Sequence, residues 1–316
     1  SISTAAASDP SINKINTMER KALVEIETSQ RVDPSGTIVM HYDNIDEFVA
    51  NVRETCPEIS DYELGEFVLE YTGQYYEGLT EQEVLEALTL QDVTITKQYF
   101  TVDDHGNLQI QTLLPKLTEE DSSSDEQIVD ADISILTAYS KEDTIGSENV
   151  YRVWAAAEWI NFPGVCIKDA FYLNKSATFD DDYTESGHVS QIFECNTCGY
   201  QTRLYRYVDK DDKTDGDLTL KYSLNGAPYL EFTPFSPQCE RCDMGTASVA
   251  DKQFSVFLRY WIRADESSII QAGYGHTTTS LFPSDISISL GGDGVSFGFS
   301  MPRSTIREYI ARPLTV

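Results

Sequence analysis

The chain has 316 residues, of which 41% are hydrophobic and 11% aromatic, so its composition is that of a folded globular protein and excludes a fibrous or disordered one. Lys and Arg number 23 against 52 Asp and Glu, and the formal net charge of −29 repels phosphate backbones, so we predict no nucleic-acid partner. No run of residues approaches the roughly 18 uninterrupted apolar positions of a membrane-spanning helix, so we predict no transmembrane segment.

The first residues indicate where the protein works. Ser1–Ser8 is a tract of small residues like the mature side of a signal-peptide cleavage site, which predicts an extracellular or cell-surface location. Further along, Ala22–Glu27 alternates apolar and polar residues, which predicts a strand, and Pro34-Ser35-Gly36 predicts a turn.

Three short helices are predicted between residues 43 and 90, because apolar residues recur there at three- and four-residue steps. Each has a polar capping residue or a defined end: Asp43 to Cys56, Ser60 or Asp61 to Gly73, and a helix after the capping box Thr80–Glu83. After them, strand-like segments flank Asp103–Asn107, whose Gly and Asn favour a tight turn, so we predict a β-hairpin.

The charge pattern suggests where the chain divides. Residues 118–130 are a self-repelling acidic and serine-rich run, which predicts a linker between an N-terminal module (1–117) and a second domain (131–316). In the second domain many short apolar runs alternate with turn signals, which favours an antiparallel β-sandwich. The predicted fold class is therefore α+β, mainly β. The predicted strands are Ile133–Tyr139, Val150–Ile160, His188–Phe193, Thr202–Val208, Leu218–Leu224, Tyr229–Phe232, Gln253–Arg263, Ile269–Tyr274, Ile286–Leu290 and Val295–Met301.

Four cysteines carry the clearest motif. Cys195 and Cys198 are separated by two residues and followed by Gly199, and Cys239 and Cys242 repeat that spacing. Two such pairs supply the four soft ligands of tetrahedral Zn²⁺. Residues 193–245 thus resemble a zinc ribbon, although the gap between the pairs exceeds the usual 15 to 20 residues or so. We predict a structural zinc site in this lobe.

Disulfides are the alternative to zinc, because an exported protein meets oxidising conditions and both pairs could close internally or across. Redox chemistry is disfavoured, since no thioredoxin-like βαβ pattern surrounds either pair. Cys56 and Cys166 lie on opposite sides of the linker, where they form either an interdomain disulfide or two unrelated buried thiols.

A second metal hypothesis concerns Asp209–Asp217, whose repeated aspartates suggest a calcium loop. Lys213 stands where an EF-hand needs an oxygen ligand, and no Glu closes the twelve-residue frame. The alternative, which we favour, is a solvated hairpin tip.

Motifs for catalysis are weak. The histidines (His41, His105, His188 and His276) have no paired ligand spacing, and no nucleophile elbow, zinc-protease motif or phosphate loop is present. Glu158, between Trp154 and Trp159, is the one carboxylate worth following, with a surface position as the plainer interpretation.

Three functional hypotheses follow. The leading one is a non-catalytic secreted or cell-surface protein with a structural β-sandwich that self-associates through its strand edges. The second is an extracellular carbohydrate- or protein-binding module that uses aromatic surfaces such as Tyr75-Tyr76 or Trp154 and Trp159. The third is a secreted hydrolase whose carboxylates meet only on folding.

Overall fold

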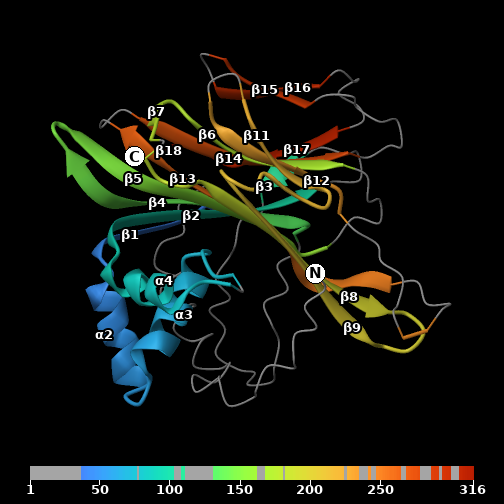
Figure 1. Ribbon diagram of the computed structural model, residues 1–316, viewed down its shortest axis with the longest axis horizontal. Coiled ribbons are helices and arrows are strands. Elements are labelled where there is room, and N and C mark those ends of the chain that lie inside the picture. The colour runs from blue at the N-terminus through green and yellow to red at the C-terminus, as the bar shows by residue number, and fades with distance from the viewer. Residues whose placement is uncertain are drawn as a thin grey trace.

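Figure 1 shows the computed structural model, a mostly antiparallel β structure whose described residues include three α-helices in the N-terminal third. Two sheets pack as a sandwich, and the helices lie on the outer face of the larger sheet. The predicted fold class is therefore confirmed. The described residues are 37–76, 78–102, 108–110, 131–161, 168–180, 182–223, 226–234, 241–242, 247–264, 268–277, 286–291, 294–299 and 306–316.

The helices are α2 (Asp46–Thr55), α3 (Asp61–Tyr71) and α4 (Glu81–Glu86), with a 3-10 turn η2 (Ala87–Thr89) after α4. The larger sheet has, in spatial order, β1 (Ile38–Asn44), β2 (Gln91–Val102), β4 (Ile133–Ile145), β5 (Glu148–Trp159), β13 (Ala247–Ala264), β8 (Ser186–Cys195) and β9 (Gln201–Asp209), with β3 (Leu108–Ile110) beside β2 and β7 (Thr178–Phe179) beside β13. The second sheet has β10 (Thr214–Asp215), β11 (Leu218–Tyr222), β12 (Pro228–Phe232), β6 (Asp169–Lys175), β14 (Ile269–Thr277) and β17 (Ile306–Ile310), with β18 (Leu314–Thr315) beside β14. A separate hairpin joins β15 (Ile286–Gly291) to β16 (Gly294–Phe299).

The main core fills the space between the two sheets. Alternate residues of β5, including Val153 and Ala155, point into it, as the period of two in the sequence predicts. Trp159 is 2% exposed and meets the Tyr274 ring edge-on, with centroids 5.5 Å apart. Because each fully buried large side chain contributes about 1.5 to 3 kcal/mol, this layer supplies most of the stabilisation of the sandwich.

A second core lies between the helices and the outer face of the larger sheet. Trp154 is fully buried there, and its indole Nε1 donates a hydrogen bond to the Thr72 carbonyl at 2.8 Å. Strands β2 and β4, which flank the predicted linker, pair directly, with Phe100 opposite Ile133. The division into domains stays a prediction, since residues 118–130 lie outside the described part of the chain, but strands from both sides of it share one sheet.

The helix boundaries follow their capping residues. Ser60 and Glu63 form a reciprocal capping box at α3, and Thr80 and Glu83 form another at α4, as the latter motif predicts. The predicted Asp43 cap is wrong. The α2 helix begins at Asp46, whose backbone N–H donates instead to Asn44 Oδ1 at 3.0 Å. No described helix is both long and apolar enough to span a bilayer.

The sequence pattern does not predict several of the strands. All seven residues of β6 are buried, so its sequence lacks the alternation that marks a half-exposed strand. Strand β1 does alternate, but it follows directly on a turn signal and runs into the helical pattern. The predicted strand Ala22–Glu27 lies outside the described residues.

An aromatic stack covers His188 on the outer face of the larger sheet. The rings of Tyr76 and Phe257 lie 5.0 Å from the imidazole centroid, and Tyr205 lies at 5.4 Å. Burial, with a smaller contribution from Arg259, lowers the pKa of His188 to about 3. The folded protein therefore holds this imidazole neutral.

This neutral imidazole makes the fold sensitive to acid. Below about pH 6.5 the unfolded state binds a proton at His188 and the folded state does not, so stability falls as the pH decreases toward 3. Between about pH 7.5 and pH 5, His188→Phe should lose about 2 kcal/mol less unfolding free energy than the parent protein. Denaturant titrations at both pH values measure this difference, with the half-exposed His41→Gln as control. Equal acid sensitivity of His188→Phe and the parent would contradict the buried neutral state.

Candidate metal centre

The first two cysteines lie in a tight turn between β8 and β9. Cys195 is the last residue of β8, and its carbonyl accepts a hydrogen bond from Gly199 N at 2.8 Å. Gly199 has a φ of +68°, which explains why glycine follows the second thiol. The backbone N–H of Thr197 donates to Cys195 Sγ at 3.4 Å. The turn thus directs one amide, that of Thr197, at the Cys195 sulfur.

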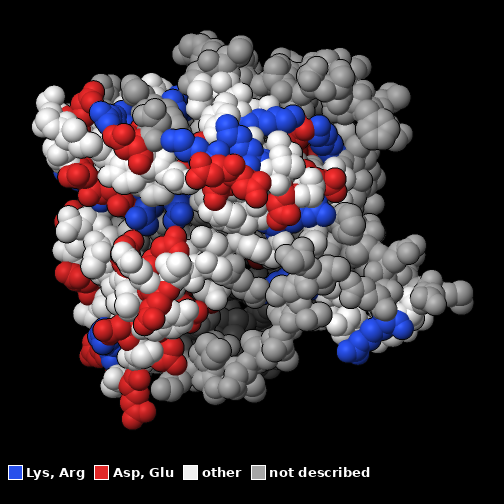
Figure 2. Space-filling model, in the orientation of Figure 1, with Lys and Arg blue, Asp and Glu red and all other residues white. Residues whose placement is uncertain are grey.

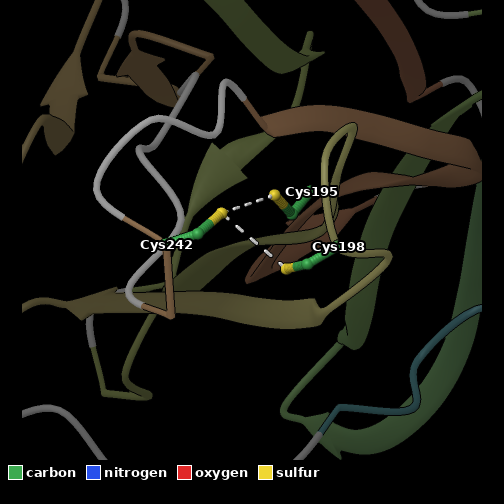
Figure 3. A group of neighbouring side chains, drawn as sticks. All are labelled: Cys195, Cys198 and Cys242. Carbon is green, nitrogen blue, oxygen red and sulfur yellow. Dashed lines mark hydrogen bonds between the residues drawn. The ribbon is translucent and has the colours of Figure 1, made fainter.

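The third cysteine comes from a loop that precedes β13. Cys242 lies five positions before Ala247, which pairs with Cys195 across the sheet. The Arg241 guanidinium lies over the Tyr200 ring, 3.8 Å from its centroid, and so holds the second loop against the first. Figure 3 shows the three thiols converging from these two segments.

The sulfur positions fit a shared metal ion. Cys242 Sγ lies 3.5 Å from Cys195 Sγ and 3.9 Å from Cys198 Sγ, and all three sulfurs lie within 4.8 Å of one another. Four thiolates around tetrahedral Zn²⁺, with Zn–S bonds of about 2.3 Å, would stand about 3.8 Å apart. A disulfide requires about 2.05 Å. The spacing around Cys242 is therefore that of metal ligands, and no bond joins it to Cys195 or Cys198.

The burial of the three thiols differs. Cys195 is 3% exposed, Cys242 is half-buried and Cys198 is exposed. An ion among them would therefore be shielded on the strand side and open to solvent on the turn side. The exposed Cys198 gives a metal an approach path from solvent. Cys239, the fourth predicted ligand, lies outside the described residues.

The remaining cysteines stay unassigned. Cys56 caps the C-terminal end of α2, where its N–H donates to the Val52 carbonyl and its side chain packs against the helical core. Cys166 lies outside the described residues, so a disulfide between the two stays a prediction.

The predicted calcium loop forms a hairpin tip. One carboxylate oxygen of Asp209 accepts the backbone N–H groups of Asp211 and Asp212 at 2.9 and 2.8 Å. Asp215 accepts from Tyr207 N, and Asp217 pairs with the Arg206 guanidinium at 3.3 Å. These carboxylates therefore form their hydrogen bonds and ion pair within the hairpin. Among the described residues, only the three cysteines gather at least three groups able to ligate a metal.

The aromatic residues proposed as binding surfaces take different positions. Trp154 and Trp159 are buried, so the prediction that they form a surface is wrong; the strand period places them on opposite faces, and both faces of β5 are covered. Tyr75 is 37% exposed, whereas Tyr76 packs into the His188 stack. Glu158 is exposed, as the plainer interpretation of its sequence position predicts.

A buried polar cluster was missed by sequence reasoning. Asp169 is fully buried and accepts hydrogen bonds from the Tyr274 hydroxyl at 2.5 Å and from His276 Nδ1 at 2.9 Å. His276 lies directly opposite Asp169 in the β6–β14 pairing. The two residues are 107 positions apart, and only the strand register brings them together. The Tyr274 hydroxyl and His276 Nδ1 thus satisfy the hydrogen-bonding capacity of a carboxylate that is buried among aromatic rings.

Comparisons with known proteins add little to this geometry. No family model matches the chain, and no curated protein matches it. One solved structure with partial similarity is the Clostridium perfringens NetB toxin in its membrane-inserted form, at 9% identity, covering 68% of this chain and 94% of the toxin with a TM-score of 0.20. At that score the likeness supports no conclusion about fold or function.

Removing one thiol tests whether these residues hold a metal. Cys198→Ser takes away an exposed ligand without disturbing a core, so it should lower both the zinc content and the melting temperature, by about 2 °C or more for each kcal/mol lost. Elemental analysis and calorimetry measure the two effects. Cys56→Ser is the matched control and should keep the metal. Zinc content and melting temperature that both match the parent would contradict the assignment.

Proposed function

We propose that Cys195, Cys198 and Cys242, together with Cys239, hold one zinc ion as a structural element of a non-catalytic β-sandwich protein that works outside the cell. The observation that supports this most directly is the 3.5 and 3.9 Å spacing of the sulfur atoms around Cys242. An all-sulfur ligand set is typical of closed structural zinc sites, whereas catalytic sites keep one position for water.

The surroundings of the site support a structural role for the proposed metal ion. The β8–β9 end projects away from the body of the sandwich (Figure 1). Tyr205 and Tyr207 of β9 pack in the His188 stack, but residues 201–204, the part of β9 next to the cysteines, include no buried residue, so little hydrophobic burial holds that end in place. The β8–β13 pairing also shifts register between Val249 and Phe254, which separates the cysteine end from the regular sheet. A zinc ion would replace the missing core.

The location outside the cell is a proposal from the sequence. The charge of the surface is compatible with it. Figure 2 shows acidic side chains gathered over the helices, whose first turns carry Asp46 and Glu47, Asp61 and Glu63, and Glu81 and Glu83. Such a surface, with a net charge of −29, keeps the protein soluble and favours an environment whose salt screens the repulsion. In the described residues, no observation favours the hydrolase hypothesis over this one.

Metal removal should loosen one end of the molecule only. Chelation of the zinc under reducing conditions should speed amide hydrogen exchange in β9 and in the last residues of β8. Strands β6 and β12 lie in the other sheet and serve as internal controls, so their exchange should stay unchanged. Hydrogen exchange with mass spectrometry measures both. Unchanged protection of β9 after verified loss of the metal would show that the ion has no structural role.

The proposal includes self-association through a strand edge. β1 ends the larger sheet, and among the described strands only β2 pairs with it. Val39 lies on the face of β1 opposite to Ile38 and Met40, which pack in the helical core, and it is 36% exposed. An edge of this kind can pair with the same edge of a second copy.

Light scattering tests this association. The apparent mass should rise with protein concentration, and Val39→Lys, which places a charge on the edge, should lower it toward that of one chain. Leu85→Lys, on the exposed surface of α4, is the control and should associate like the parent. A mass equal to one chain at every concentration would contradict this part of the proposal.

A further inference from the structure

A pocket of about 430 Å³ opens between the end of α3 and the outer face of the larger sheet. This volume lies within the range of small-molecule sites. Tyr71 and Tyr75 at the end of α3 form one wall, and residues of β2, β4, β5 and β13 form the floor. The pocket shares none of the cysteines, so it is independent of the metal centre.

The strand register explains the shape of the floor. Leu136, Ala156 and Phe257 lie side by side on neighbouring strands and on one face of the sheet. The small Ala156 between two larger side chains leaves a depression. At the helical wall, Gly73 has a φ of +75° and packs closely against the Leu136 side chain. Only a small part of the floor is therefore exposed, since Leu136 is 6% and Phe257 3% exposed. This part of the pocket is apolar.

Opposite charges line the adjoining part. Lys97 stands in the same row as Leu136, and Glu158 stands two positions further along, opposite Ser134 and Ser255. The two side chains therefore project from the same face of the sheet. In the described part of the chain, no ion pair within 4.0 Å joins the Lys97 ammonium or the Glu158 carboxylate to another residue. The Lys97 ammonium lies over the Tyr99 ring at 5.3 Å from its centroid and interacts with the Tyr99 side chain. The Glu158 side chain is exposed, and both residues line the pocket.

The Lys97 side chain keeps its positive charge at neutral pH. Interaction with Tyr99 raises the pKa of Lys97 and is opposed by burial, while the Glu158 carboxylate adds to the increase. Glu70 contributes a second carboxylate to the pocket lining. One cation and two anions give the pocket a net charge of −1, which disfavours ligands that carry only negative charge.

We propose that this pocket binds a zwitterionic α-amino acid with an apolar side chain. The ligand carboxylate contacts Lys97 and the ligand ammonium contacts Glu158. The apolar side chain lies on Leu136, Ala156 and Phe257. Such a ligand meets both charges with charge-assisted hydrogen bonds and covers the apolar floor in the same binding event.

The opposite charges favour this class over a carbohydrate. A neutral sugar would stack on the tyrosine rings and use the serine hydroxyls, but it would offer no opposite charge to Lys97 or to Glu158. A ligand with only a carboxylate would meet Lys97 and face the two glutamates. The zwitterion is the simplest small molecule that satisfies the apolar floor and both charges.

Calorimetric titration of the full-length protein with L-phenylalanine, N-acetyl-L-phenylalanine, L-phenylalaninamide and methyl glucoside tests the proposal. L-Phenylalanine should bind, and each derivative that lacks one charge should bind about tenfold or more weakly, because a hydrogen bond to a charged group is lost. Methyl glucoside should show no binding at the same concentration. Binding of the sugar in place of the amino acid, or no binding of L-phenylalanine at millimolar concentration, would overturn the proposal.

Two variants assign the charges. Glu158→Gln should weaken L-phenylalanine binding about tenfold or more and should not weaken N-acetyl-L-phenylalanine, because it removes a carboxylate that repels this anion. Lys97→Met should weaken L-phenylalanine binding and should not weaken L-phenylalaninamide, because it removes an ammonium that repels this cation. Glu148→Gln, an exposed change at the other end of β5, is the control and should bind like the parent. Unaltered melting temperatures would verify folding, and variants that bind all ligands like the parent would overturn the assignment.

Discussion

Strand β13 pairs with β5 along one side and with β8 along the other, and this double pairing positions both hydrophobic cores and the cysteine turn. Its inward residues, such as Phe254 and Val256, pack against the second sheet. Its outward residue Phe257 forms part of the helical core and of the pocket floor. Its first residue, Ala247, stands opposite Cys195 and so brings the loop of Cys242 to the other thiols. One long strand therefore sets the positions of the core, the pocket and the candidate metal centre.

Side-chain burial and the proposed metal ion would stabilise different parts of the sheet around β13. Across most of β13, both faces are covered, one by the second sheet and one by the helices. In β9, residues 201–204, the part next to the cysteines, include no buried residue. A metal ion there would do what side-chain burial does elsewhere, namely hold neighbouring strands in a fixed register. The acidic surface is compatible with this division, because neither the buried core nor thiolate ligands require a neutral exterior.

Local patterns in the sequence predicted much of the fold. The capping box at Thr80 and the alternation along β5 depend on neighbours within a few residues, and both appear as predicted. Strand β6 was missed because burial on both faces removes the alternation. Trp154 was taken for a surface residue because nothing local reveals that helices cover that face. Those contacts arise only when distant segments pack.

The candidate sites divide in the same way. The two-residue spacing of Cys195 and Cys198 is a local signal, and it predicted the turn in which they lie. Lys97 and Glu158 lie on different strands and carry no such signal, and neither do Asp169 and His276. Only the strand register reveals that each pair shares a face. Sequence reasoning therefore singled out the cysteines, which come in closely spaced pairs, and missed the side-chain groups that depend on pairing between strands.

The proposed role of the cysteines requires that sulfur atoms coordinate a zinc ion. X-ray absorption at the zinc edge of the native protein, with the zinc content and the mass of the unreduced chain, measures this coordination. We expect one zinc per chain with sulfur ligands at about 2.3 Å. Protein without zinc, with a mass that shows these cysteines joined as disulfides, would contradict it.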